Sequence, residues 1–330
     1  MRILAAILVT TGIIMAAGGF WVWKQLDTPC STDDRQVVFT IHPGQNLKQI
    51  AASLESRGLI SDALFFTLYA RYKKAGTRLP AGEYILPANL SQIQILHTLL
   101  EGKVRLYRLT IPEGLNMQET AVLVAGSGFC DTKTFLSLCT DQAFIADLSV
   151  PSHTLEGFLF PDTYFFSKSA DCRQVIKKMV ATFFSVFTPR WQKRAETLEL
   201  SLQEVVTLAS MIEKEAGVAE ERPLIASVFH NRLEKRMRLE SDPTVIYGDP
   251  EFEGRIRTRH LRRKTEYNTY QMHGLPKGPI ASPGAKALEA ALYPAKSDYL
   301  FFVSKNDKTH YFSRTLAEHN RAVRKYQLNR

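Results

Sequence analysis

The chain has 330 residues, of which 45% are hydrophobic and 23% charged, a balance typical of a protein that folds around a core. This composition excludes a largely disordered protein. The formal net charge is +9, but the basic residues lie in short clusters, and no zinc-finger or RNP-type motif accompanies them. We therefore expect no nucleic-acid partner, although a basic surface also suits other acidic polymers.

The cysteines and histidines show no metal-binding spacing. The four cysteines (Cys30, Cys130, Cys139 and Cys172) form no CxxC pair, and the eight histidines form no HExxH motif. We predict neither a metal nor a cofactor. The simplest interpretation is that the cysteines are small buried hydrophobic residues. The alternative is one disulfide between Cys130 and Cys139, which are close in the chain, in an oxidising compartment.

The N-terminal segment from Ile3 to Trp23 carries no charge. About 21 residues of helix can span a bilayer of roughly 30 Å, and Trp21 and Trp23 occupy an interfacial position. We predict a cytoplasmic tip at 1–2, a transmembrane anchor at 3–23 and a linker at 24–35. The alternative is a cleaved signal peptide, whose apolar region would be unusually long. An N-terminal anchor usually places the rest of the chain outside the cytoplasm.

The next segment has the order strand, helix, helix, strand. Val37 to Ile41 is β-branched and alternating, as is typical of a strand. Asn46 is a helix cap before apolar residues at helical spacing, Ser61 opens a second helix, and Gly82 to Leu86 is a second strand. This order resembles a LysM-type glycan-binding module; the alternative is a generic small α+β domain.

We assign 36–105 to this LysM-like module and 106–330 to a larger mixed domain, so the predicted fold class is α+β. A short helix is expected over Ser91 to Leu100 and a strand over Leu106 to Ile111. The aromatic segment from Gly157 to Tyr164 is expected to lie in the core. The alternative is that it forms a wall on which sugars stack.

One helix of the larger domain carries two acidic residues near its end. Ser201, with Glu204 three residues later, fits a capping box, so this helix should run to about Ala216. On a wheel of about 100° per residue, Glu215 falls at the edge of the apolar stripe and Glu213 falls off it. The two carboxyl groups therefore point to different sides and cannot act as a pair.

Glu215 is the residue directed toward packed side chains. Burial of a carboxyl group raises its pKa. A carboxylic acid that is protonated near neutral pH can deliver the proton that the leaving oxygen of a glycosidic bond requires. The alternative is a structural glutamate paired with an arginine such as Arg222 or Arg232.

Several motifs follow one another around this helix. Leu208 to Ala216 reads LASMIEKEA, and the segments Ala226 to Leu233, Met237 to Gly248, Tyr267 to Tyr270 and Ser282 to Gly284 come after it. Together these motifs resemble the MltG/YceG-like endolytic murein transglycosylases over nearly the whole chain. One departure is His230, where that family often has an aliphatic residue.

The resemblance implies a lytic transglycosylase of the bacterial inner membrane, anchored by Ile3–Trp23, with its catalytic part in the periplasm or extracytoplasmic space. It implies that Glu215 is the catalytic residue and Glu213 a supporting one. Candidates for substrate contacts lie in the motifs that follow: Asn231, Asp242, Thr244, Tyr247, Tyr267, Asn268, Thr269 and Tyr270. For each of these the alternative is a structural role in a turn.

The implied reaction cuts nascent peptidoglycan strands between MurNAc and GlcNAc, leaves 1,6-anhydromuramic ends and helps to terminate strand elongation. An association with peptidoglycan synthases is a further implication. Two alternatives remain open. One is a hydrolytic muramidase in which Asp242 activates water, and the other is an anchored peptidoglycan-binding scaffold without catalysis.

Overall fold

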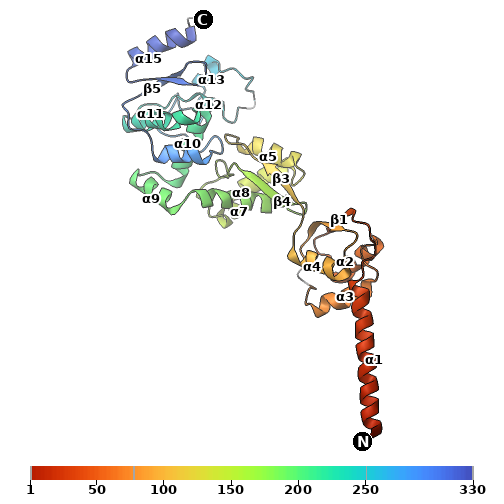
Figure 1. The fold of residues 1–330 in the computed structure, drawn as a ribbon. Helices are drawn as coiled ribbons and strands as arrows, with labels where there is room; N and C mark the ends of the chain where they lie inside the picture. The colour runs from red at the N-terminus through yellow and green to blue at the C-terminus, as the bar shows by residue number, and fades with distance from the viewer. Residues whose placement is uncertain (1, 77–78, 250, 329–330) are drawn as a thin grey trace. The chain divides into compact units, whose positions relative to one another are not determined.

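The computed structural model describes residues 2–76, 79–249 and 251–328, and the chain divides into two compact units. Unit 1 comprises residues 1–108 and 165–170, and unit 2 comprises residues 109–164 and 171–330. Figure 1 labels most of the helices and strands, numbered in chain order. The divisions at residues 108 and 164 fall within β3 (Leu106–Thr110) and β4 (Thr163–Ser167), which pair in a two-stranded sheet.

Unit 1 begins with α1 (Arg2–Asp27). Side chains along this helix, including Ile13 and Phe20, are exposed, whereas Leu26 near its end is buried. No helix in the part of the chain that the structure describes is long and apolar enough to cross a membrane. A helix thus forms over the predicted transmembrane segment Ile3–Trp23, but the predicted span is not supported. Met1, in the predicted cytoplasmic tip, lies outside the described residues.

The small core of unit 1 is built by two strands and three helices. These are β1 (Gln36–Ile41), α2 (Leu47–Ser56), α3 (Ala63–Tyr72), β2 (Gly82–Pro87) and α4 (Gln92–Glu101). β1 and β2 are antiparallel, with Phe39 opposite Tyr84, and both of these side chains are buried. Asn46 caps α2 and Asp62 caps α3 through side-chain hydrogen bonds. The predicted element order is observed, and the LysM-like glycan-binding role stays a prediction.

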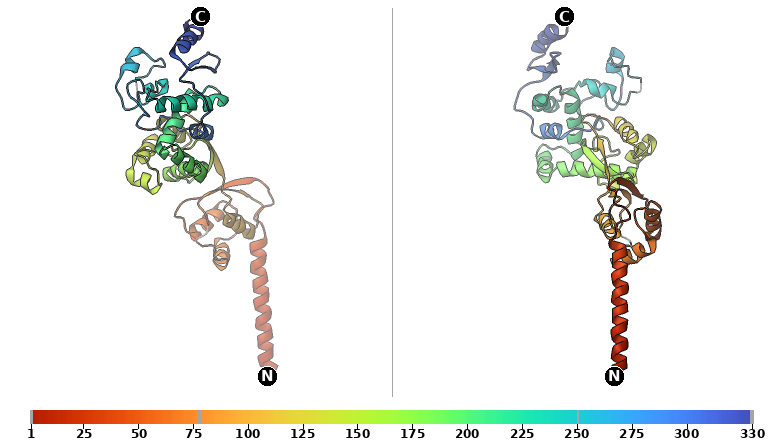
Figure 2. Two further views of the ribbon diagram at one scale, coloured as in Figure 1. Left: turned by 90° about the vertical axis from the view of Figure 1, so that its left-hand side faces the viewer. Right: turned by 45° about the vertical axis from the view of Figure 1, so that its right-hand side comes forward.

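Unit 2 is mainly helical. Its α-helices are α5 (Met117–Gly126), α6 (Thr132–Thr140), α7 (Gln142–Asp147), α8 (Cys172–Val186), α9 (Pro189–Thr197), α10 (Leu202–Glu215), α11 (Arg222–Glu234), α12 (Asp242–Ile246), α13 (Thr258–Arg262), α14 (Ala285–Leu292) and α15 (Leu316–Val323). A short 3-10 helix (Ala219–Glu221) and a π-helix (Arg324–Leu328) complete them. The antiparallel hairpin of β5 (Phe301–Ser304) and β6 (His310–Ser313) lies beside α15 (Figure 2). Small sheets and many helices confirm the predicted mixed α+β class.

Helix α10 lies at the centre of unit 2. Ser201 caps it in a capping box with Glu204, as predicted. Every residue from Val205 to Ile212 is buried, so the helix is covered on all faces and not only along the predicted stripe. The reason is that α11, α12 and α14 all pack against it. A helix enclosed in this way fixes the direction of the acidic residues at its C-terminal end.

The aromatic segment before β4 belongs to the core of unit 2. Phe158 and Leu159 are fully buried, and Tyr164 is 3% exposed. The Phe158 ring meets the Phe183 ring of α8 edge to face, with centroids 5.0 Å apart. The predicted core role of this segment is confirmed.

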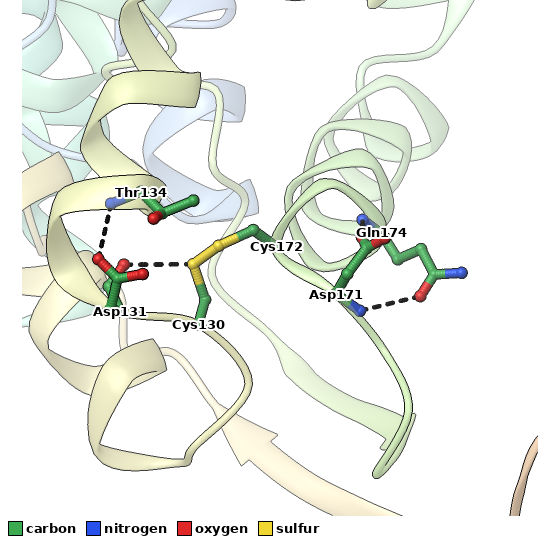
Figure 3. Close-up of a disulfide and its surroundings, with 6 residues drawn as sticks. All are labelled: Cys130, Asp131, Thr134, Asp171, Cys172 and Gln174. Atoms are coloured by element: carbon green, nitrogen blue, oxygen red, sulfur yellow. Dashed lines mark hydrogen bonds between the residues drawn. A yellow bond between two sulfur atoms is a disulfide. The ribbon is translucent and has the colours of Figure 1, made fainter. Parts of the chain in front are cut away.

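A disulfide joins Cys130 to Cys172 at the beginnings of α6 and α8 (Figure 3). Asp131 caps α6 and Asp171 caps α8, so both cysteines lie beside ordered helix ends. The predicted alternative of a Cys130–Cys139 disulfide is wrong. The simpler interpretation of buried free cysteines holds for Cys139 but is wrong for Cys130 and Cys172, which are bonded, and for Cys30, which is exposed. Because the bonded cysteines are 42 residues apart in the chain, only the packing of α6 on α8 brings them together.

Candidate active site

The candidate catalytic residue, Glu215, is the last residue of α10, and it lines a cavity of about 650 Å³ in unit 2. The walls come from the segment after α11, the start of α12, Tyr270, the β5–β6 hairpin and α15. Glu240 and Asp242 line the same cavity, and the Asp242 carboxylate lies close enough to Glu215 to raise its pKa. The cavity is large enough for part of a polymeric ligand.

The Glu215 carboxyl group is held by a serine from the next segment. Ser241 donates a hydrogen bond from Oγ to Glu215 Oε1 over 2.6 Å. Burial raises the pKa of Glu215 to about 7, while the Ser241 hydroxyl and the backbone N–H of Asp242 act in the opposite direction. The nearby Asp242 carboxylate adds to the increase. This carboxyl group can therefore both give and accept a proton near neutral pH.

Glu213, two residues earlier, has different partners. Its carboxylate forms an ion pair with Arg222 over 2.7 Å and accepts the backbone N–H of Gly284 over 3.1 Å. The Glu213 side chain is only 7% exposed, and the residue is not part of the cavity lining around Glu215. The two glutamates thus point to different sides, as the wheel predicted. Glu213 supports the structure by joining α10 to α11.

The alternative of a structural ion pair for Glu215 finds no support, because both candidate arginines are engaged elsewhere. Arg222 pairs with Glu213. Arg232 donates to the Glu240 carboxylate over 3.2 Å and to the carbonyl oxygens of Leu239 and Leu300. Glu215 instead has a neutral hydroxyl donor and faces a cavity, which is the arrangement expected of a general acid.

Two of the predicted substrate residues line the cavity beside Glu215. Tyr270 donates a hydrogen bond from Oη to Asp242 Oδ1 over 2.7 Å, and both residues contribute to the wall. Asp242 begins α12 and is followed by Pro243, which is favoured in the first turn of a helix. The structure therefore brings Glu215, Asp242 and Tyr270 together around one space.

Three other predicted residues are buried and organise the backbone. Thr244 and Thr269 are fully buried and share a hydrogen bond of 2.9 Å between their hydroxyl groups. Asn268 is 1% exposed, and its side-chain amide donates to three carbonyl oxygens, the shortest bond being 2.6 Å to Arg263. Their polar atoms have protein partners, so these residues shape the site and do not face the cavity.

Asn231 and His230 on α11 also have structural partners. The Asn231 amide donates to the carbonyl oxygens of Ser297 and Tyr299. His230 forms a 2.8 Å hydrogen bond from Nε2 to the carbonyl oxygen of Ala291, and burial lowers its pKa. A neutral His230 that donates this bond joins α11 to α14. The position at which this sequence departs from the family pattern therefore has a role in packing.

Tyr247 and Tyr267 lie in a separate cluster around a second buried carboxyl group. Their ring centroids are 4.6 Å apart. Tyr247 donates a 2.8 Å hydrogen bond from Oη to Glu156, which also accepts the backbone N–H of Met117. Burial raises the pKa of Glu156 to about 7. These residues are not among those that line the Glu215 cavity.

Sequence reasoning assigned no role to Ser241 or Glu240 and considered Arg232 only as an ion-pair partner of Glu215. Ser241 binds Glu215, and Glu240 and Arg232 line the same cavity. The available signal for Ser241 was its place two residues before Pro243, because serine is favoured at the N-cap and proline in the first turn of a helix. That signal predicts a local turn only. The contact with Glu215, 26 residues earlier in the chain, depends on how α12 packs against α10.

The sequence matches a family model and several named relatives. The model of the YceG-like family matches residues 39–325. A Bacillus subtilis (strain 168) protein named endolytic murein transglycosylase is 33% identical over 330 residues, covering 95% of this chain and 91% of the relative. A protein of the same name from Streptococcus pneumoniae serotype 2 (strain D39 / NCTC 7466) is 31% identical, covering 94% of this chain and 62% of its own length.

A solved structure supports the same relationship. The crystal structure of a yceG-like protein from Listeria monocytogenes superposes with a TM-score of 0.61 at 35% sequence identity. The match covers 87% of this chain and 98% of the Listeria chain. The resemblance predicted from the motifs is confirmed, and this chain belongs to the YceG-like family.

Proposed function

We propose that this protein is a lytic murein transglycosylase, with Glu215 as its only catalytic carboxyl group. Relatives that are named endolytic murein transglycosylases match at least 94% of the chain. The observation that carries the proposal is the Glu215 carboxyl group, which faces a cavity of about 650 Å³, has a pKa of about 7 and forms its hydrogen bond with a neutral serine.

In the proposed reaction, protonated Glu215 donates its proton to the oxygen that links MurNAc to GlcNAc, and the bond from the anomeric carbon to that oxygen breaks. The 6-hydroxyl of the same muramic acid then attacks the anomeric carbon. Glu215, now a carboxylate, takes the proton of that hydroxyl. The product is a 1,6-anhydromuramic end, and no water molecule needs activation.

A carboxyl group serves these two steps best when its pKa lies near the working pH, because it must be protonated in the first step and ionised in the second. Burial of Glu215 provides this balance. We further propose that the enzyme cuts within nascent strands, which limits their length and requires access to the products of peptidoglycan synthases. The Cys130–Cys172 disulfide supports a location in an oxidising compartment outside the cytoplasm.

A hydrolytic muramidase is the second candidate, because Asp242 lines the same cavity as Glu215. In that reaction Asp242 would activate water, and the new end would be a reducing sugar. The Tyr270 hydroxyl donates its hydrogen bond to Asp242 Oδ1, so this oxygen is already engaged and is not free to accept a proton from water. The observation therefore favours the transglycosylase, and the two reactions differ in their product.

The test is mass spectrometry of uncrosslinked glycan strands after incubation with the purified full-length protein. We expect anhydro ends with the wild type, none with Glu215→Gln, and wild-type cleavage with Glu289→Gln, which removes an exposed carboxyl group on α14. Reducing ends would establish the muramidase. Full activity of Glu215→Gln would contradict the proposal, and a folded wild type that binds strands without cutting them would indicate a scaffold.

A further inference from the structure

The hydroxyl group that contacts Glu215 belongs to a residue that is fixed on both sides. Ser241 is only 1% exposed, and its Oγ donates to Glu215 over 2.6 Å. Its backbone N–H donates to Thr269 Oγ1 over 2.9 Å, and its carbonyl oxygen accepts from Thr244 Oγ1 over 2.6 Å. Both backbone polar groups of Ser241 are therefore hydrogen-bonded, and the position of its side chain is restricted.

The two threonines form a small buried network of their own. Their hydroxyl groups share a 2.9 Å hydrogen bond, and the backbone N–H of Thr269 donates to Thr244 Oγ1 over 3.3 Å. Both side chains are fully buried. A buried polar network with its bonds formed holds one conformation, so it is suited to fixing Ser241 and not to binding a ligand.

The residues before Ser241 are held by a buried arginine. Arg232 donates from Nη1 to the carbonyl oxygens of Arg238 (3.0 Å) and Leu239 (3.1 Å) and to the Glu240 carboxylate (3.2 Å). Glu240 has a φ of 49°, a left-handed conformation that side chains other than glycine seldom adopt. Such a conformation persists only where surrounding contacts enforce it.

We propose that Ser241 is a positioning residue whose fixed hydroxyl orients the Glu215 carboxyl group and allows it to act first as an acid and then as a base. This inference rests on the proposed function. With Oε1 bonded to Ser241, the proton is carried on Oε2. Burial alone favours the protonated form and would leave a poor acid for the first step. The hydroxyl donor stabilises the carboxylate and restores the balance.

The test compares the pH dependence of cleavage by the full-length wild type and Ser241→Ala on uncrosslinked glycan strands. The fall of kcat/KM at high pH reports the loss of the proton from Glu215 in the free enzyme. We expect its midpoint to rise by about one pH unit in Ser241→Ala, the size of one charge-assisted hydrogen bond. We expect kcat to fall about tenfold, since the carboxylate becomes harder to form.

Two further variants separate this role from a general loss of packing. Ser227→Ala removes another buried hydroxyl from unit 2, one that donates to the carbonyl oxygen of Leu224 and shares a hydrogen bond with Ser297. It should leave the midpoint unchanged. Ser241→Thr keeps the hydroxyl and should return the midpoint toward the wild-type value.

A folded Ser241→Ala protein with the wild-type midpoint overturns the inference. If circular dichroism shows that Ser241→Ala fails to fold, Thr269→Val tests the inference in its place. This variant removes the hydrogen bond to the Ser241 backbone N–H but keeps the Ser241 hydroxyl. It should raise the midpoint by about half a unit, and an unchanged midpoint overturns the inference. Full activity of Glu215→Gln would remove the proposed function instead. An inactive Glu215→Gln beside an unshifted Ser241→Ala removes this inference alone.

Discussion

Among the described residues of unit 2, burial raises the pKa of two carboxyl groups, Glu215 and Glu156, to about 7. Each accepts one side-chain hydroxyl, from Ser241 and Tyr247 respectively. They differ in access. Glu215 lines the large cavity, whereas Glu156 is 4% exposed and also binds the backbone N–H at the beginning of α5.

A raised pKa does not identify a catalytic acid by itself. Both carboxyl groups can hold a proton near pH 7, but Glu215 lines a cavity that can hold part of a polymer, whereas Glu156 is enclosed by protein. Perturbed groups occur in structural networks as well as in active sites. Access to a cavity, and not the pKa, assigns the chemistry to Glu215. The Glu156 carboxyl group joins the segment before β4 to α5 and to Tyr247.

The largest expected effect separates the two residues by activity. We expect Glu215→Gln to lower the rate of glycan cleavage by at least about 100-fold, since it removes the general acid. Glu156→Gln should keep the rate within about tenfold of the wild type, because it changes packing at a distance. Both variants are assayed by the release of anhydro ends after folding is checked. Equal losses in the two variants would place Glu156 in the reaction.

The next effect concerns the thermal stability of the helices next to Glu156. Leu155, the residue before Glu156, donates its backbone N–H to the carbonyl oxygen of Cys139 in α6, whose beginning is tied to α8 by the Cys130–Cys172 disulfide. Closing a loop of this length stabilises the folded state by about 4 kcal/mol in the chain-entropy picture. A double Cys130→Ser, Cys172→Ser variant should therefore unfold at a lower temperature by calorimetry, with little change in cleavage rate.

Cys139→Ser is the matched control, because Cys139 is a buried free thiol. Reductant should lower the melting temperature of the wild type and of Cys139→Ser, but not that of the double variant. A cleavage rate that falls together with the disulfide would show that the Glu215 cavity depends on it. The region around Glu156 and the Glu215 cavity would then not be independent of each other.

The smallest effect is a pH dependence of stability caused by Glu156. Its pKa rises from an ordinary value of 4.5 to about 7 on folding, so between these values the folded state binds a proton that the unfolded state has released. The resulting stabilisation is complete below pH 4.5 and is lost as the pH rises through 7, a change of about 3 kcal/mol. Urea unfolding of the wild type at pH 5 and pH 8 measures this contribution together with that of Glu215, whose pKa is raised equally. Glu156→Gln should therefore remove about half of the difference.

Local signals in the sequence predicted local structure well. The Ser201 capping box and the apolar spacing after it placed the beginning and end of α10 close to its observed bounds, because caps and periodicity act within one helix. The same wheel sent Glu213 and Glu215 to different sides, and their separate partners agree with it. The motif resemblance correctly indicated the YceG-like family.

Only the tertiary structure decided which polar residues surround the catalytic candidate. Asn268 and Thr269 looked like substrate contacts in the sequence, but their side chains are buried in backbone hydrogen bonds. The partners of Glu215 and Glu156 lie 26 and 91 residues away, and the disulfide closes over 42 residues. Such contacts depend on how helices pack, and no local pattern encodes them. The sequence by itself determined the helix, its caps and the direction of Glu215, whereas packing of α12 against α10 decided that a fixed serine meets it.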